Sequence, residues 1–117
     1  MKKPSVTLMG NQSITSQNII DMLKFHKDAL LKYGVKRIGL FGSYARGDQK
    51  KNSDMDFLVE FDKPVFENFM DLAFYLENLF GKKVELITNG NLSPYIQPYV
   101  EKEVKWYETE SAISYVP

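Results

Sequence analysis

The chain has 117 residues, of which 44% are hydrophobic and 14% aromatic, so it has the size of a single domain and enough apolar surface for a packed core. Fifteen basic residues balance fifteen acidic ones, which excludes the strongly positive field of a general binder of nucleic acid or anionic membranes. The lack of cysteine excludes disulfides and thiol nucleophiles, and a single histidine excludes a histidine cluster. Carboxylates are therefore the side chains that remain as metal ligands, and they suit Mg²⁺ or Mn²⁺.

The charges are unevenly divided along the chain. Residues 1–58 carry ten basic and five acidic residues, and residues 59–117 carry five basic and ten acidic ones. A phosphate-binding site therefore fits the first half better. The start of the chain lacks the apolar segment of a signal peptide, and no run approaches the roughly 18 apolar residues of a membrane span. We expect a cytoplasmic protein without membrane contact.

Apolar spacing predicts the first two elements. An amphipathic helix is expected over residues 16–33, capped by Ser13 or Ser16 and ended by Gly34. His26 falls inside it without a partner motif, so we interpret it as a residue at the surface or the core edge. A short strand is expected over residues 35–41, between two glycines.

The second half predicts two further strands and two helices. A strand begins near Asp54 and runs to Phe61, with one apolar face and one face that starts with two acids. An apolar helix over residues 66–80 ends at Gly81. We interpret its stripe as core, and the stripe consists of Phe66, Phe69, Met70, Ala73, Phe74 and Phe80.

The last elements complete the predicted architecture. A third strand over residues 83–88 precedes a turn-rich stretch, and a helix is favoured from Tyr95 to about Glu103, with the tail either helical or extended. This order predicts an α/β (α+β) domain, in which helices pack on a small mixed β-sheet. We expect one domain over residues 1–117, with a core at about residues 16–103.

Three carboxylates are candidate metal ligands. Asp54 and Asp56 are two positions apart on a strand, so their side chains point the same way. Two such like charges are most easily tolerated at the solvent end of a strand or with a divalent cation between them. Glu85 interrupts an otherwise apolar strand. Either it joins the aspartates around metal ions, or it is exposed on an edge strand.

A glycine turn is the candidate phosphate site. Gly42 and Ser43 follow a strand and open a short helix through Arg46, so backbone N–H groups and a hydroxyl can approach a ligand closely. Arg46 can add charge-assisted hydrogen bonds to phosphate oxygens. The bland alternative for Ser43 is a helix cap.

The spacing of these residues resembles a known signature. Gly42-Ser43, ten residues, then Asp54-x-Asp56 and a later strand acid at Glu85 resembles the DNA polymerase beta nucleotidyltransferase superfamily. The run from Ile38 to Val59 is most similar to the minimal nucleotidyltransferase (MNT) family, whose members are often paired with a HEPN-domain toxin. The resemblance covers about residues 16–103 and implies the nucleotidyltransferase fold.

The resemblance also implies roles for the residues that match its motif. Asp54 and Asp56 would hold two Mg²⁺ ions, and Gly42 and Ser43 would bind the nucleotide triphosphate. Arg46 matches the arginine of the family's Ala-Arg-Gly run and would assist there. Glu85 would complete the metal site and could deprotonate the attacking hydroxyl. This position is commonly aspartate in the family, so the extra methylene leaves metal ligand and base as alternatives.

The function implied by the resemblance is Mg²⁺-dependent transfer of AMP from ATP to a hydroxyl, that of a tyrosine, on a HEPN toxin. The protein would then be an antitoxin in a hetero-oligomer, with no direct contact to nucleic acid. A binding-only antitoxin and a small-molecule nucleotidyltransferase are the alternatives, and the lack of room for an acceptor domain disfavours the latter. An aromatic, acidic tail could contact the partner or complete the core, and it contains Tyr95, Tyr99, Trp106 and Tyr107 with Glu101, Glu103, Glu108 and Glu110.

Overall fold

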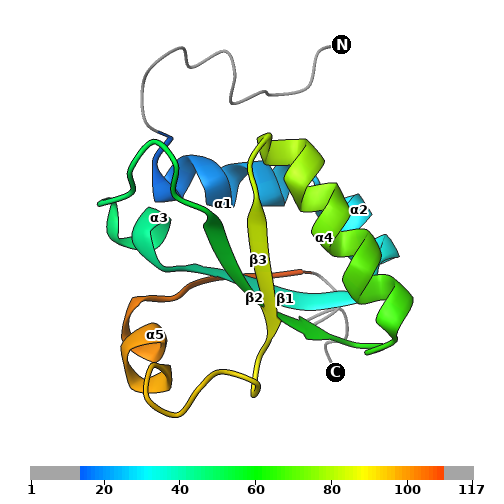
Figure 1. The fold of residues 1–117 in the computed structure, drawn as a ribbon. Helices are drawn as coiled ribbons and strands as arrows, with labels where there is room; N and C mark the ends of the chain where they lie inside the picture. The colour runs from blue at the N-terminus through cyan, green and yellow to red at the C-terminus, as the bar shows by residue number, and fades with distance from the viewer. Residues whose placement is uncertain (1–13, 110–117) are drawn as a thin grey trace, which may run out of the picture.

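A single mixed sheet forms the centre of the computed structural model, which describes residues 14–109 (Figure 1). Its strands lie in the order β3-β2-β1-β4, and they are β1 (Val35–Phe41), β2 (Met55–Phe61), β3 (Val84–Thr88) and β4 (Lys105–Glu108). β1 pairs antiparallel with both β2 and β4, whereas β2 and β3 are parallel. The small mixed sheet predicted from the sequence is therefore confirmed.

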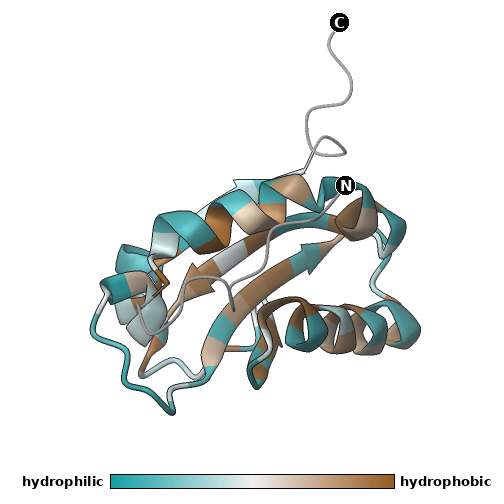
Figure 2. Cartoon of the chain, turned by 90° about the horizontal axis from the view of Figure 1, so that it is seen from above, coloured by the Kyte–Doolittle hydropathy of each residue, from teal (hydrophilic) through white to brown (hydrophobic). Residues whose placement is uncertain are grey.

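Helices cover both faces of this sheet. α1 (Ser16–Phe25), α2 (Lys27–Lys32) and α4 (Phe66–Phe80) lie on one face, and α5 (Gln97–Glu103) lies on the other (Figure 1). The larger core cluster fills the space between the sheet and α1, α2 and α4. A smaller cluster under α5 contains Phe41, Leu58, Leu92 and Val100. Apolar colour is concentrated on the strands, while the helices carry both colours (Figure 2). Within residues 14–109, no helix is long and apolar enough to cross a bilayer.

The first predicted helix is interrupted at His26. The expectation of one helix over residues 16–33 was wrong, because His26 has φ −104° and ψ 29° and separates α1 from α2. The break places His26 Nδ1 2.7 Å from the Tyr75 hydroxyl of α4, and the half-buried ring lies at the core edge as expected. Neither predicted cap is seen: Ser16 lies inside α1 and Ser13 lies outside the described residues. Thr15 caps α1, where its Oγ1 accepts from the backbone N–H of Asn18 at 3.0 Å.

The bounds of α4 match the prediction, but its buried face does not. Leu72, Leu76 and Phe80 follow each other at i+4 spacing and are fully buried. Phe66 and Phe74 are 75% and 58% exposed, so the expectation that the whole aromatic stripe is core was wrong for these two. Leu72 and Leu76 lie on one line along the helix axis, so one orientation of the helix buries both of them.

The segment after α5 forms an edge strand of the described sheet rather than a longer helix. α5 ends at Glu103, and β4 then pairs with β1, with Trp106 opposite Gly39. No residue with a side chain fits at position 39, because a Cβ there would lie 2.6 Å from Val104 Cγ2 and 2.9 Å from the Trp106 ring. α5 is held by this pairing near the end of β1, where the candidate site residues lie.

Candidate active site

Asp54 directly precedes β2 and Asp56 is its second residue, next to the end of β1 and the beginning of β3. In the sheet register Asp56 is opposite Phe41 on one side and Glu85 on the other. Asp56 is half-buried, whereas Asp54 and Glu85 are exposed, Glu85 on the edge strand. The predicted carboxylates are therefore neighbours, with Asp56 at the centre.

The surroundings of Asp56 disfavour its negative charge. Burial, together with the negative charges of Glu85 and Asp54, raises the pKa of Asp56 from 3.8 to about 6. The guanidinium of Arg46 acts in the opposite direction, and the carboxylate of Glu103 adds to the repulsion. This corner of the sheet thus has an excess of negative charge that a cation would neutralise.

The two aspartates fit a magnesium ion that takes its remaining ligands from a substrate and from water. Among residues 14–109, no group of three or more histidine, aspartate or glutamate side chains is arranged to hold a metal ion. Mg²⁺ is usually bound by only one or two carboxylates together with substrate phosphates and water. Asp54 and Asp56 suit that mode of binding. The assignment of Glu85 as a third ligand stays a prediction.

The Gly42 turn lies directly against Asp56. Gly42 has φ 78° and ψ −157°, and a side chain at this position would overlap the carboxylate of Asp56. The carbonyl of Gly42 accepts hydrogen bonds from Ala45 and Arg46 at 3.0 and 3.1 Å, which begins the predicted short helix α3 (Ser43–Arg46). The turn and the two aspartates, 12 to 14 positions apart in sequence, therefore form one site.

Glu103 is a site residue that the sequence did not reveal. Its Oε2 accepts the backbone N–H of Gly42 at 2.6 Å, and its Oε1 accepts from Arg46 Nη1 at 3.0 Å. Arg46 Nε also donates to Asp48 Oδ2 at 3.1 Å. The hydrogen bonds from Asp48 and Glu103 raise the pKa of Arg46. In the sequence, Glu103 was one of several acids in the tail, 61 positions from Gly42, with no spacing that linked it to the turn.

The tail aromatics divide between two environments. Tyr95 and Tyr99 are 86% and 72% exposed. Trp106 lies under the guanidinium of Arg37, 3.8 Å from the ring centre, and Tyr107 packs on the larger core cluster. The expectation that the tail rings complete the core is therefore confirmed for Trp106 and Tyr107. Contact of Tyr95 and Tyr99 with a partner stays a prediction.

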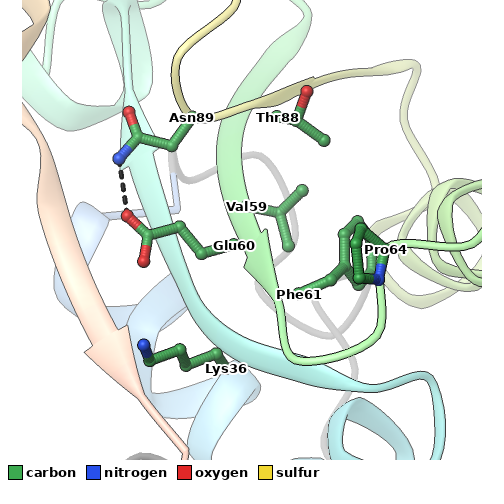
Figure 3. A pocket seen from close by; sticks show the side chains of 7 residues that line it. All are labelled: Lys36, Val59, Glu60, Phe61, Pro64, Thr88 and Asn89. Carbon is green, nitrogen blue, oxygen red and sulfur yellow. Dashed lines mark hydrogen bonds between the residues drawn. The ribbon is translucent and has the colours of Figure 1, made fainter.

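A pocket of about 300 Å³ lies at the opposite end of β2 (Figure 3). It is lined by Lys36, Val59, Glu60, Phe61, Pro64, Thr88 and Asn89. The Glu60 carboxylate already accepts from Arg37 at 2.8 Å and from Asn89 at 2.6 Å. These contacts tie the strands together at the end remote from the aspartates, so we assign this pocket a structural role.

Comparison with known proteins places most of the chain in one sequence family. A family model described as a nucleotidyltransferase domain matches residues 22–107. A protein of Methanocaldococcus jannaschii with the provisional name of protein adenylyltransferase is 44% identical over 95 residues, which cover 77% of this chain and 95% of that protein. Protein adenylyltransferase MntA of Thermococcus cleftensis is 41% identical over 93 residues, covering 78% of this chain and 94% of its own length.

Solved structures share the fold. One, described provisionally as a minimal nucleotidyltransferase, has a TM-score of 0.59 at 30% identity and covers 74% of this chain and 93% of its own. A toxin–antitoxin complex solved with AMP-PNP contains a chain with a TM-score of 0.55 at 24% identity, covering 75% of this chain and 82% of that one. The second likeness concerns the fold alone.

Proposed function

Because the chain belongs to the nucleotidyltransferase domain family, we propose that it transfers AMP from ATP to a tyrosine hydroxyl of a HEPN toxin, and so acts as an antitoxin. The observation that carries this proposal is the contact between the Gly42 turn and Asp56. A phosphate bound at the turn would lie beside the aspartates, which is what two-part recognition of a metal–nucleotide complex requires.

Each site residue has a role in this proposal. Asp54 and Asp56 hold Mg²⁺, and Gly42 and Ser43 bind the triphosphate through the turn. Arg46 lies at the end of α3, where its positive charge can reach a phosphate once it leaves its carboxylate partners. Glu85, opposite Asp56, is a further ligand or the base that takes the proton of the attacking hydroxyl.

The reaction is an in-line displacement at the α phosphorus. The acceptor oxygen forms a bond to that phosphorus, its proton passes to a base, and the bond to the β-phosphate oxygen breaks to release pyrophosphate. When bound, Mg²⁺ supplies neutralisation of phosphate charge and activation of the acceptor oxygen. The close approach of the Gly42 turn to Asp56 would place a triphosphate bound at the turn beside the aspartates, and such positioning favours alignment for attack.

A protein acceptor is supported by the names of the relatives. Both curated relatives bear the name protein adenylyltransferase, and each is covered over at least 94% of its length. The HEPN toxin and its tyrosine are what the MNT resemblance implies. Tyr95 precedes α5 and Tyr99 lies on it, and both exposed rings would give such a partner aromatic anchors at the helix whose last residue, Glu103, contacts Gly42.

Label transfer tests the proposal. The purified chain would be incubated with Mg²⁺ and ATP labelled at the α phosphate in a lysate of the source organism, beside the Asp54→Asn, Asp56→Asn double variant. An Asp71→Asn variant is the matched control, because Asp71 is an exposed carboxylate on α4, away from the site. We expect one labelled protein with the wild type and the control, and none with the double variant.

The identity of the labelled band separates the alternatives. Mass spectrometry should find AMP on a tyrosine of a HEPN protein. A labelled small molecule instead of a protein would favour the small-molecule enzyme. A partner that co-purifies equally with all three forms and carries no label would overturn the enzymatic proposal in favour of a binding-only antitoxin.

A further inference from the structure

Glu103 occupies the donors that the proposed function assigns to the nucleotide. The Gly42 N–H and the Arg46 guanidinium both donate to its carboxylate, at 2.6 and 3.0 Å. A carboxylate is an anion with oxygens spaced to accept such a pair, as a phosphate is. We infer that Glu103 stands in for a nucleotide phosphate in the free protein and must leave Gly42 and Arg46 when the triphosphate binds. This inference rests on the proposed function.

The contact differs from an ordinary surface ion pair. The Glu103 side chain is only 19% exposed, and it reaches from the end of α5 to the turn that directly follows β1. A backbone N–H carries one hydrogen, so Gly42 cannot donate fully to Glu103 and to a phosphate oxygen at once. Arg46 is likewise engaged by both Asp48 and Glu103. A phosphate therefore competes with Glu103 for these donors.

Charge adds to the competition. Glu103 lies with Asp54, Asp56 and Glu85 around one corner of the sheet, so a triphosphate that arrived with Glu103 in place would meet a further negative charge. Removing only that charge should therefore strengthen nucleotide binding. If Glu103 instead served to hold the turn and Arg46 ready for the nucleotide, the same change would weaken binding. The direction of the effect separates the two roles.

The test measures affinities of the full chain by calorimetry in the presence of Mg²⁺. The variant is Glu103→Gln, which keeps the shape and one acceptor oxygen but removes the charge. The control is Glu101→Gln, because Glu101 is exposed on the same helix and its hydrogen bond is to Gln97, at 2.9 Å. The probes are ATP, inorganic tripolyphosphate and adenosine.

We expect ATP and tripolyphosphate to bind about tenfold more tightly to Glu103→Gln than to the wild type, and adenosine to bind equally to both. Glu101→Gln should behave as the wild type. Weaker or unchanged binding of ATP to Glu103→Gln would overturn the inference and leave the proposed function standing. If the folded wild type and Glu103→Gln both fail to bind ATP and tripolyphosphate, the inference and the proposed function fail together.

A second measurement uses the unaltered chain, so it holds even where the variant unfolds. In an NMR titration with tripolyphosphate, the Gly42 amide and the Glu103 side-chain carboxyl carbon should shift along the same binding curve. A shift of the Gly42 amide with the Glu103 carboxyl unchanged would mean that the carboxylate stays in place, which would overturn the inference.

Discussion

Gly42 and Asp56 share one space: the carboxylate of Asp56 fills the place that a side chain at position 42 would need. The sheet register produces this relationship, since Asp56 lies opposite Phe41, the last residue of β1. The turn that follows Phe41 must then pass directly over the aspartate, and it does so with φ 78°. The presence of Asp56 on the strand therefore requires a glycine at position 42 of the turn.

Gly42→Ala should damage both stability and transfer. Its φ and ψ lie in a region that is essentially restricted to glycine, and the new methyl group would collide with Asp56. We expect a loss of about 2–4 kcal/mol in the free energy of unfolding, and loss of label transfer. Urea denaturation and the label-transfer assay measure the two effects.

Gly47 supplies the matched control for this change. It also has a positive φ, 84°, but a Cβ there would meet nothing within 4 Å. Gly47→Ala should cost only about 1 kcal/mol and keep transfer, because Gly47 has the less strained αL conformation and the added methyl group meets no collision. Equal effects of the two substitutions would show that the contact with Asp56 is unimportant.

Asp56→Asn should stabilise the fold at neutral pH. A carboxyl whose pKa is raised to about 6 in the folded state favours folding below about pH 4, and that contribution is lost as the pH rises through 6. At pH 7.5 the charged Asp56 carboxylate thus destabilises the folded state, and asparagine removes that charge. Because the side chain is half-exposed, solvent screens part of the effect, and we expect a gain on the order of 1–2 kcal/mol.

Urea denaturation at pH 7.5 and pH 4 checks the sign. The gain from Asp56→Asn should be present at pH 7.5 and absent at pH 4, where the wild-type carboxyl is protonated. Asp71→Asn should change the free energy of unfolding by less than about 0.5 kcal/mol. A loss of stability at pH 7.5 would contradict the proposed repulsion among the carboxylates.

The parts of the site that were predictable are those encoded by local spacing. Strand alternation placed Asp54 and Asp56 together, and the glycines marked the ends of β1 and α4. The break at His26 was not predictable from the local spacing, and the partner of its ring, Tyr75, lies 49 positions away. Glu103 was missed for the same reason: its relation to Gly42 exists only after β4 has joined the sheet.

The phase of α4 was mispredicted because the helix carries two apolar lines, both at helical spacing. The predicted stripe included Phe66 and Phe74, which are exposed, whereas the buried line runs through Leu72 and Leu76. Leu76→Ala should therefore cost about 2–5 kcal/mol in the free energy of unfolding, as a buried leucine that leaves a cavity. Phe74→Ala, despite removing more atoms, should cost less than about 1 kcal/mol. Urea denaturation of both variants decides whether the leucines form the buried face.

Binding of Mg²⁺ and ATP should be strongly coupled. Since no group of three or more metal-ligating side chains stands ready among residues 14–109, the phosphates must supply ligands that the chain does not. We expect Mg²⁺ alone to raise the Tm only slightly. Mg²⁺ with ATP, at about ten times the apparent Kd, should add about 1.4 kcal/mol of stability, which corresponds to roughly 5 °C for a domain of this size.

Replacing Asp54 and Asp56 by asparagine should remove the Mg²⁺-dependent part of the shift, whereas Asp71→Asn should retain it. A full shift with Mg²⁺ alone, or the same shift in the double variant, would mean that the ion binds elsewhere, because the two aspartates act on the metal only in company with the triphosphate.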